Sequence, residues 1–175
     1  MNMKKLIYLI IALTLSCSLY SQGFADYLTS TSYINTGYEK FKLSDYKGAI
    51  ADYTKAIELD PGFAEAYNYR GYAKDKLSDY SGALADYTKA IELDPKHAKA
   101  YNNRGLTKKN LSDYMGAIAD YTKAIELDPK YARAYNNRGL SKIQLGQKEN
   151  GCLDLSKARE LGYEKAYAMI SKYCQ

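Results

Sequence analysis

The decamer DYTKAIELDP occurs three times in this chain of 175 residues, at Asp52–Pro61, Asp86–Pro95 and Asp120–Pro129. The copies start 34 residues apart, and a constant period of this length indicates a chain built from stacked structural repeats. The flanking sequence repeats as well, since residues 64–97 and 98–131 match at 25 of 34 positions. We therefore divide most of the chain into four units, the last of them diverged: Ser30–Phe63, Ala64–His97, Ala98–Tyr131 and Ala132–Lys165.

Each unit has the pattern of two amphipathic helices joined by a short turn. In the second unit, residues three or four apart mark one face of the first helix: Tyr67, Gly71, Lys74 and Leu77. The face of the second helix is marked in the same way by Ala83, Tyr87, Ala90 and Ile91. We expect the two helices to cross closely where Gly71 meets Ala83. Pro95 would end the second helix because proline lacks an N–H group. One such hairpin cannot bury its apolar face alone, so neighbouring hairpins must stack into an all-α solenoid.

The repeat resembles the tetratricopeptide repeat. The residues that carry the family pattern in the third unit are Tyr101, Gly105, Ala117, Tyr121 and Pro129, and the first two units have the same elements. The resemblance covers Ser30 to about Lys165. It implies a right-handed superhelical solenoid of four helix-turn-helix hairpins, closed by a capping helix within residues 163–175, for which the sequence favours Tyr163–Tyr173.

Two departures from the family pattern suggest ion pairs inside the hairpins. The family's Leu is Arg in three units and its second aromatic residue is Lys in all four: Arg70, Arg104, Arg138, and Lys40, Lys74, Lys108, Lys142. A buried Arg needs a partner. Because the helices of a hairpin are antiparallel, each Arg should lie level with an acid of the second helix. We predict three structural pairs: Arg70 with Asp86, Arg104 with Asp120, and Arg138 with Asp154.

The resemblance also implies a function, that of a non-catalytic protein–protein interaction scaffold. In this family the first helices of successive units line a concave groove that binds an extended peptide or a partner helix. The candidate partner-binding residues here are Asn68, Tyr72, Lys99, Asn102, Asn103, Lys109, Arg133, Asn136 and Asn137, and the same face carries Asp75, Leu106, Leu140 and Ile143. Asparagine amides suit a peptide backbone, and the cationic side chains favour an acidic or carboxylate-bearing segment.

Some family members hold the C-terminal carboxylate of a peptide in a clamp of Lys, Asn and Arg side chains. Asn103 and Arg133 match two positions of that clamp, whereas Asn68, Tyr72 and Asn137 depart from it. The clamp is therefore incomplete, and we do not expect a chaperone-tail adaptor.

No catalytic or metal-binding constellation stands out. Nearly every polar feature appears three times, whereas an active site is assembled once. His97, the single histidine, lies at a junction between units. The equivalent positions of the adjacent units are Phe63 and Tyr131, which favours a packing role for His97. We expect no enzyme activity, no metal and no cofactor.

The N-terminal segment has the layout of a secretory signal peptide. Lys4 and Lys5 precede an apolar run from Leu6 to Leu15, which is too short to span a bilayer as a helix. We expect a signal peptide over residues 1–21 and a linker over 22–29. The ending at Tyr20-Ser21-Gln22 resembles signal peptides of Bacteroidota.

Two alternatives stay open for this segment. Cys17 could carry a lipid, which would make the protein a lipid-anchored subunit of a cell-envelope assembly, or the segment could remain as an uncleaved anchor. The expected location is periplasmic or extracellular, with membrane association only in these two cases.

The expected export also predicts a disulfide bond. After cleavage, Cys152 and Cys174 are the remaining thiols, and they lie at similar distances on either side of the turn at Gly162. On antiparallel helices those positions come close together, and an oxidising compartment favours a disulfide between them.

The charge balance argues against nucleic acid as the partner. The net charge of +5 includes Lys4 and Lys5, so cleavage leaves about +3, interspersed with Asp and Glu. We therefore expect a protein or peptide partner, with acidic segments favoured and nucleic acid excluded.

Overall fold

A computed structural model describes residues 25–174 of the chain, and the predicted signal peptide over residues 1–21 and the lipidation candidate Cys17 lie outside this range. Every regular element within residues 25–174 is a helix. The chain divides into two compact units, of which the first ends at Phe63 and the second begins at Ala64. We describe each unit by itself.

The first unit is a single hairpin. Residues 25–42 are helical and are followed by α2 (Tyr46–Leu59). Residues 25–29 were expected to belong to a linker, but they continue the first helix. A contact explains this extension, because the ring of Tyr27 packs against that of Phe63 at a centroid distance of 6.5 Å.

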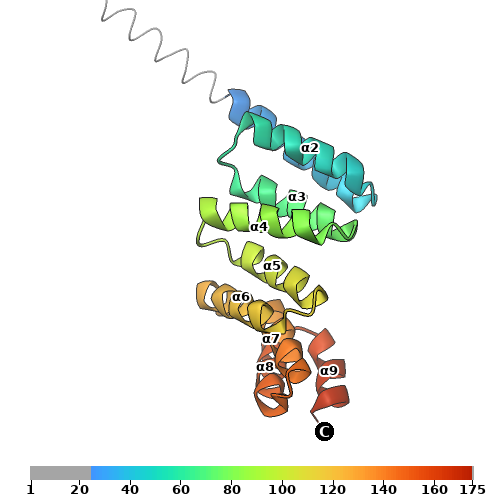
Figure 1. The fold of residues 1–175 in the computed structure, drawn as a ribbon, viewed down its shortest axis with the longest axis vertical. Helices are drawn as coiled ribbons and strands as arrows, with labels where there is room; N and C mark the ends of the chain where they lie inside the picture. Colours follow the sequence, from blue (N-terminus) through green and yellow to red (C-terminus); the bar gives the residue numbers. More distant parts are fainter. Residues whose placement is uncertain (1–24, 175) are drawn as a thin grey trace, which may run out of the picture. The chain divides into compact units, whose positions relative to one another are not determined.

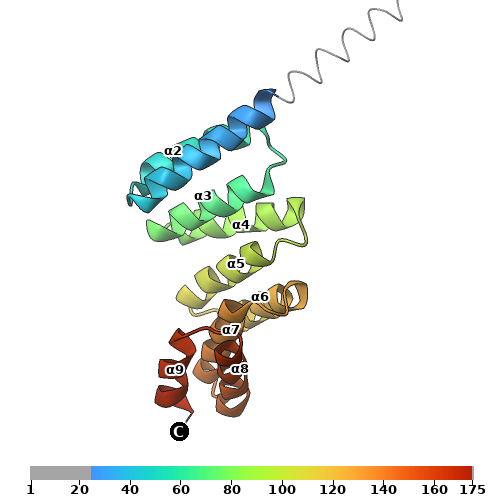
Figure 2. The same ribbon diagram turned by 180° about the vertical axis from the view of Figure 1, so that it is seen from behind.

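The second unit contains three further hairpins and a final helix. Its helices are α3 (Ala64–Lys76), α4 (Tyr80–Leu93), α5 (Ala98–Asn110), α6 (Tyr114–Leu127), α7 (Ala132–Gln144), α8 (Lys148–Glu160) and α9 (Lys165–Tyr173). Figures 1 and 2 show them stacked in chain order, with the pairs α3–α4, α5–α6 and α7–α8 as hairpins and α9 beside α8. No helix among residues 25–174 has the length and apolar character needed to span a membrane.

The turn inside each hairpin comes from the repeated sequence LSDY. In the third hairpin Ser112 has a φ of 64°, and Asp113 caps α6 by accepting a hydrogen bond from the backbone N–H of Gly116 at 2.9 Å. Ser78 and Asp79 do the same before α4. The positive φ is unfavourable for a residue with a Cβ atom. In the diverged unit Gly146, with a φ of 77°, takes the place of Ser and removes this cost.

Small residues let the two helices of each hairpin approach closely. A Cβ atom on Gly71 would lie 3.2 Å from the carbonyl oxygen of Ala83 and 3.0 Å from the ring of Tyr87. This confirms the expected close crossing. Tyr87 and its equivalents Tyr53 and Tyr121 are fully buried, and Leu155 fills the same place in the last hairpin.

The last two hairpins share a further core at their junction. Between the last two hairpins, Ala124, Ile125 and Ala134 are buried, and the partly buried rings of Tyr101, Tyr131 and Tyr135 pack against them. Because each hairpin contributes one side of such a core, burial in this unit depends on the stacking of neighbours.

The final helix α9 begins at Lys165, slightly later than the expected Tyr163. Gly162 has a φ of 84°, and the N–H of Tyr163 bonds back to the carbonyl of Ala158, so the chain is still turning at Tyr163. The predicted disulfide is confirmed: Cys152 on α8 is bonded to Cys174, with Cα atoms 5.7 Å apart.

Candidate partner-binding groove

The three predicted Arg–Asp pairs are confirmed, and each holds a hairpin together from inside. Arg104 on α5 donates from Nε and Nη2 to the two carboxylate oxygens of Asp120 on α6, at 3.0 and 2.7 Å. Arg70 with Asp86 and Arg138 with Asp154 have the same bidentate geometry. Because these carboxylates are almost fully buried, the pairing removes the cost of an isolated buried charge.

The repeated Lys supplies a second cation to each of these carboxylates. Lys108 Nζ lies 2.8 Å from Asp120, and Lys74 and Lys142 hold equivalent positions. In the first unit Thr36 stands where the others have Arg, and Lys40 alone pairs with Asp52, at 2.7 Å. The sequence carried a usable signal for this role, since each Lys follows its Arg position by four residues and so lies on the same helix face.

The Arg side chains also connect one hairpin to the next. Arg104 Nη1 donates to the hydroxyl of Thr88 on α4 at 3.2 Å, and Arg138 bonds Thr122 on α6 in the same way. The hydrogen bonds that Arg104 donates to Asp120 raise the pKa of Arg104 above its ordinary value, against the opposing effect of burial. The helices that carry the candidate groove residues are therefore tied to their neighbours by charge-assisted hydrogen bonds.

A ladder of asparagine amides runs across the first helices of the second unit. Asn136 Nδ2 donates to Asn137, Asn137 to Asn102 on α5, Asn102 to Asn103, and Asn103 to Asn68 on α3. The two bonds between helices are 3.0 Å (Asn103 to Asn68) and 3.1 Å (Asn137 to Asn102). The amide nitrogen of Asn68 is the last donor of the ladder.

The ladder corrects part of the predicted site. Asn102 and Asn136, expected to face the groove, are 1% and 5% exposed and support the ladder from within. Asn137 is also buried, at 8%. The physical reason is that the amides form hydrogen bonds with one another between adjacent helices. These bonds replace the hydrogen bonds to water that the side chains lose on burial, and so they offset the free-energy cost of burial.

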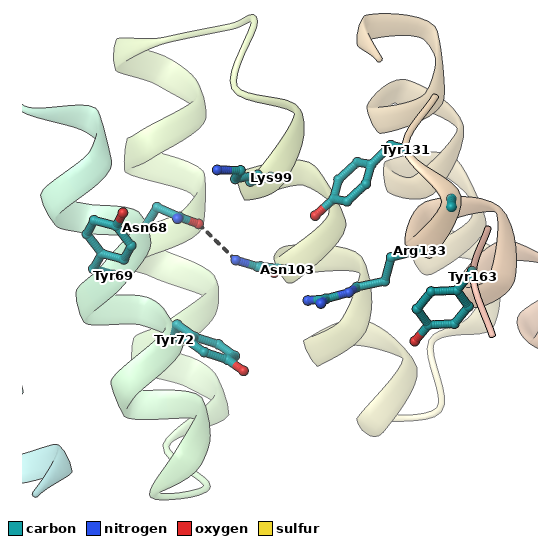
Figure 3. Close-up of a pocket in the computed structure, with 9 residues that line it drawn as sticks. Asn68, Tyr69, Tyr72, Lys99, Asn103, Tyr131, Arg133 and Tyr163 are labelled. Atoms are coloured by element: carbon teal, nitrogen blue, oxygen red, sulfur yellow. Dashed lines mark hydrogen bonds between the residues drawn. The ribbon is translucent and has the colours of Figure 1, made fainter. Parts of the chain in front are cut away.

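Five of the predicted residues converge on one pocket of about 430 Å³, which we call pocket A (Figure 3): Asn68, Tyr72, Lys99, Asn103 and Arg133. It brings together side chains from α3, α5, the start of α7 and the turn before α9. Its lining residues are Asn68, Tyr69, Tyr72, Lys99, Asn103, Tyr131, Ala132, Arg133 and Tyr163. Figure 3 shows Tyr69 and Tyr72 on one side, Tyr131, Arg133 and Tyr163 on the other, and Lys99 and Asn103 between them. Tyr69, Tyr131 and Tyr163 were not among the predicted site residues.

Two exposed cations lie in pocket A. Lys99 and Arg133 are exposed, and within residues 25–174 neither forms an ion pair. Burial raises the pKa of the Tyr131 phenol, while the neighbouring charge of Arg133 acts in the opposite direction. Pocket A is thus an aromatic hollow with a positive charge on each of two helices.

Other predicted groove residues lie elsewhere. Lys109 and Leu140 line a separate pocket of about 250 Å³, which we call pocket B, formed by Lys109, Tyr114, Leu140, Gln144, Met169 and Tyr173. Ile143 packs against Gly151 of α8, where an added Cβ atom would lie 2.5 Å from its side chain. Asp75 accepts a hydrogen bond from Thr107 of α5 at 3.0 Å, so it serves the contact between α3 and α5.

His97 occupies the N-cap position of α5 and makes no side-chain capping bond. Its Nε2 atom is buried without a hydrogen-bond partner among residues 25–174, and burial lowers its pKa, so the neutral imidazole is favoured. This setting agrees with a packing role. Within the same range, no group of three or more His, Cys, Asp or Glu side chains is arranged to hold a metal ion.

Comparison with known protein families gives matches to the repeat itself. Models described as tetratricopeptide repeat match residues 64–97, 98–131 and 120–152, and a model described as TPR repeat matches residues 37–78. Together they cover residues 37–152, which is most of the chain. A search of curated proteins gave no match.

Several solved structures are similar. The crystal structure of MamA is 27% identical, with a TM-score of 0.71 over 79% of this chain and 81% of that one. The first TPR of Spaghetti (RPAP3) bound to HSP90 peptide SRMEEVD is 28% identical, with a TM-score of 0.67 over 69% and 95% of the two chains. The Arabidopsis OM64 TPR domain is 29% identical, with a TM-score of 0.66 over 68% and 98%.

The stacked hairpins, with an open pocket formed by their first helices, define a helical-repeat scaffold for protein interactions. The chain belongs to the tetratricopeptide repeat family. Members of this family are typically non-catalytic interaction modules, and a protein-interaction scaffold is the functional class of this protein.

Proposed function

We propose that the second unit binds an acidic, extended segment of a partner protein in pocket A. The observation that carries this proposal is the pair of cations Lys99 and Arg133, which lie in a tyrosine-walled pocket without a carboxylate partner among residues 25–174. An anionic ligand would supply the negative charge that pairs with these two cations.

The pocket offers three kinds of contact to such a segment. The guanidinium of Arg133 can hold a carboxylate through two parallel hydrogen bonds, and Lys99 adds a second positive charge. Asn68 lines pocket A although it is only 4% exposed, and its amide nitrogen is the last donor of the asparagine ladder. This donor suits a peptide carbonyl or carboxylate oxygen. The four tyrosines give a large, rigid contact area with a hydroxyl at each edge.

The protein would lose little freedom on binding. The ladder fixes Asn68 and Asn103, and the Arg–Lys–Asp clusters tie each first helix to its neighbours. A site held in advance avoids most of the ordering cost on the protein side, so the contact energy appears as affinity.

One structural relative supports the choice of an acidic ligand. The peptide SRMEEVD bound by the first TPR of RPAP3 contains two Glu and one Asp. Because Tyr72 and Asn137 replace residues expected for a carboxylate clamp, we propose an acidic segment recognised by pocket A and not this particular peptide.

The test uses eleven-residue peptides with blocked ends, a central Glu-Glu pair and a fluorescent label, measured by anisotropy with the purified protein. Binding is expected for Glu-Glu and not for the matched Gln-Gln peptides. The double variant Lys99→Ala with Arg133→Ala should weaken binding by about tenfold or more, as expected for the loss of charge-assisted bonds.

The matched control is Lys89→Ala with Lys123→Ala, which removes the same charge from α4 and α6, where these lysines pair with Glu92 and Glu126. Equal weakening by both double variants would mean that only net charge matters and would rule out pocket A. Circular dichroism would check that helicity is kept.

We further propose that the protein is exported and acts in the periplasm or outside the cell. The Cys152–Cys174 disulfide supports this, because such bonds persist in oxidising compartments. The intact mass of the protein from its native host should correspond to a chain that begins at Gln22. A mass that includes an acylated Cys17 would instead identify the lipid-anchored form.

A further inference from the structure

Pocket B lies beyond pocket A along the same first helices and differs from it in chemistry. Its walls are Tyr114 at the start of α6, Leu140 and Gln144 on α7, and Met169 and Tyr173 on α9, with Lys109 of α5 beside them. Leu140 and Met169 are only partly buried, and together with the two tyrosines they form an apolar hollow of about 250 Å³. A hollow of this composition suits an aliphatic side chain.

The spacing along α7 relates pocket B to pocket A. Arg133 in pocket A and Leu140 in pocket B are seven residues apart, so they lie on nearly the same helix face and about 10 Å apart along the axis. Gln144 continues that face to about 16 Å. An extended peptide rises about 3.3 Å per residue, so three to five residues would cover this distance.

The final helix contributes to both pockets. Tyr163, just before α9, lines pocket A, and Met169 and Tyr173 line pocket B. Because α9 packs on α8, with the disulfide at its end, it forms a wall of pocket B opposite the residues of α7.

The charge near pocket B indicates which occupant fits. Lys109 forms no ion pair within residues 25–174, so the unpaired positive charge of pocket A continues to pocket B. A second copy of this chain still has a net charge of about +3 after the expected loss of Lys4 and Lys5, and it is a poor match for this surface. The chain's own lysine-bearing N-terminal segment is a poor match for the same reason. An acidic segment of another protein matches it.

We propose that pocket B is a specificity pocket that takes a Leu- or Met-sized side chain of the same partner segment, three to five residues from the carboxylate held in pocket A. This inference rests on the proposed function and adds to it the sequence pattern of the ligand and a binding role for α9.

The experiment extends the Glu-Glu peptides by placing Leu or Ser at each flanking position in turn. Leu is expected to bind about tenfold more tightly than Ser at one position three to five residues from the Glu pair, and to make little difference elsewhere. The variant Leu140→Gln should abolish this preference, so that Leu and Ser peptides bind it with equal affinity. The control Leu153→Gln alters an exposed leucine of α8 outside both pockets and should keep the preference.

The outcomes separate the two proposals. Binding that requires Glu-Glu and Arg133 but shows no preference for Leu at any position would overturn the role of pocket B and leave the proposed function standing. A preference that survives Leu140→Gln would also overturn it. If no Glu-Glu peptide binds, the proposed function fails and the specificity pocket falls with it.

Discussion

Asp120 shows how single residues stabilise this repeat, because it accepts two bonds from Arg104 and lies 2.8 Å from Lys108 while its side chain is only 6% exposed. Removing Arg104 would leave this buried carboxylate with one cation and would leave Thr88 without its partner. We predict that Arg104→Ala lowers the free energy of unfolding by about 2–4 kcal/mol, somewhat less than a complete loss of pairing would.

Denaturant titration followed by circular dichroism measures this loss. Lys123→Ala, which breaks the exposed pair with Glu126 on α6, serves as the control and should leave the midpoint unchanged. An unchanged midpoint for Arg104→Ala would show that the bonds of Arg104 to Asp120 and Thr88 contribute nothing to stability.

Asp75 makes stability depend on pH at a single carboxyl group. Burial raises its pKa above the ordinary 3.8, against the hydrogen bond from Thr107 and the charge of Lys76, which act in the opposite direction. Between the ordinary pKa and the raised one, the folded protein binds more protons at this site than the unfolded chain does. The contribution of Asp75 to stability therefore falls as the pH rises through that window and stays low above it.

Asp75→Asn removes this titration and keeps an oxygen that can accept the Thr107 bond. We predict that the variant is more stable than the parent at neutral pH and that its advantage shrinks as the pH falls towards 3.8. Unfolding free energies of both proteins across pH 3–7 would show this. An advantage that is constant with pH, or that grows in acid, would refute the assignment.

At the scale of the element, we expect α9 to depend on its disulfide for stability. The helix has nine residues, too few to be stable alone, and among residues 165–173 only Ala166 is buried. We predict that replacing Cys152 and Cys174 by Ser speeds amide exchange in residues 163–174 by about 100-fold, which corresponds to the roughly 3 kcal/mol expected for closing a loop of this length.

Hydrogen–deuterium exchange by mass spectrometry measures this change peptide by peptide. The α5–α6 hairpin serves as the internal control and should exchange as before. Equal protection of α9 with and without the bond would mean that packing on α8 is sufficient to hold the helix.

The hairpins themselves could be predicted from the sequence, because their signals are local. The 34-residue period marks the length of one unit, and Pro95 and the small residues Gly71 and Ala83 mark features inside one unit. The buried charge of Arg104 needed an acidic partner, and Asp120 was the acid at the same level of the second helix.

The interior of the candidate site could not be predicted in the same way. Asn102 and Asn103 are identical residue types about 100° apart on a helix. The packing of the neighbouring helices buries Asn102 to 1% exposure, whereas Asn103 also lines pocket A, and this difference is not visible in the sequence. Tyr163 was missed for a related reason, since it enters pocket A from the turn before α9 and not from a repeat position.

At the scale of the whole molecule, the junctions between hairpins are chemically alike. Arg104 bonds Thr88 as Arg138 bonds Thr122, and Asn103 bonds Asn68 much as Asn137 bonds Asn102. Removing residues 98–131 would bring Arg138 opposite Thr88 and Asn137 opposite Asn68, with the same residue types at the new junction.

We predict that a chain lacking residues 98–131 still folds cooperatively, as judged by a single thermal transition. A chain lacking residues 98–124, which is not a whole repeat, should not fold cooperatively.

Because its junctions between hairpins are chemically alike, such a chain can change length in steps of 34 residues and keep the same kinds of contact. Unequal recombination between near-identical gene segments would then tend to give folded products, each with one hairpin more or fewer. The shared joint chemistry thus makes the number of hairpins a variable that selection can adjust, and with it the length of partner that the protein can hold.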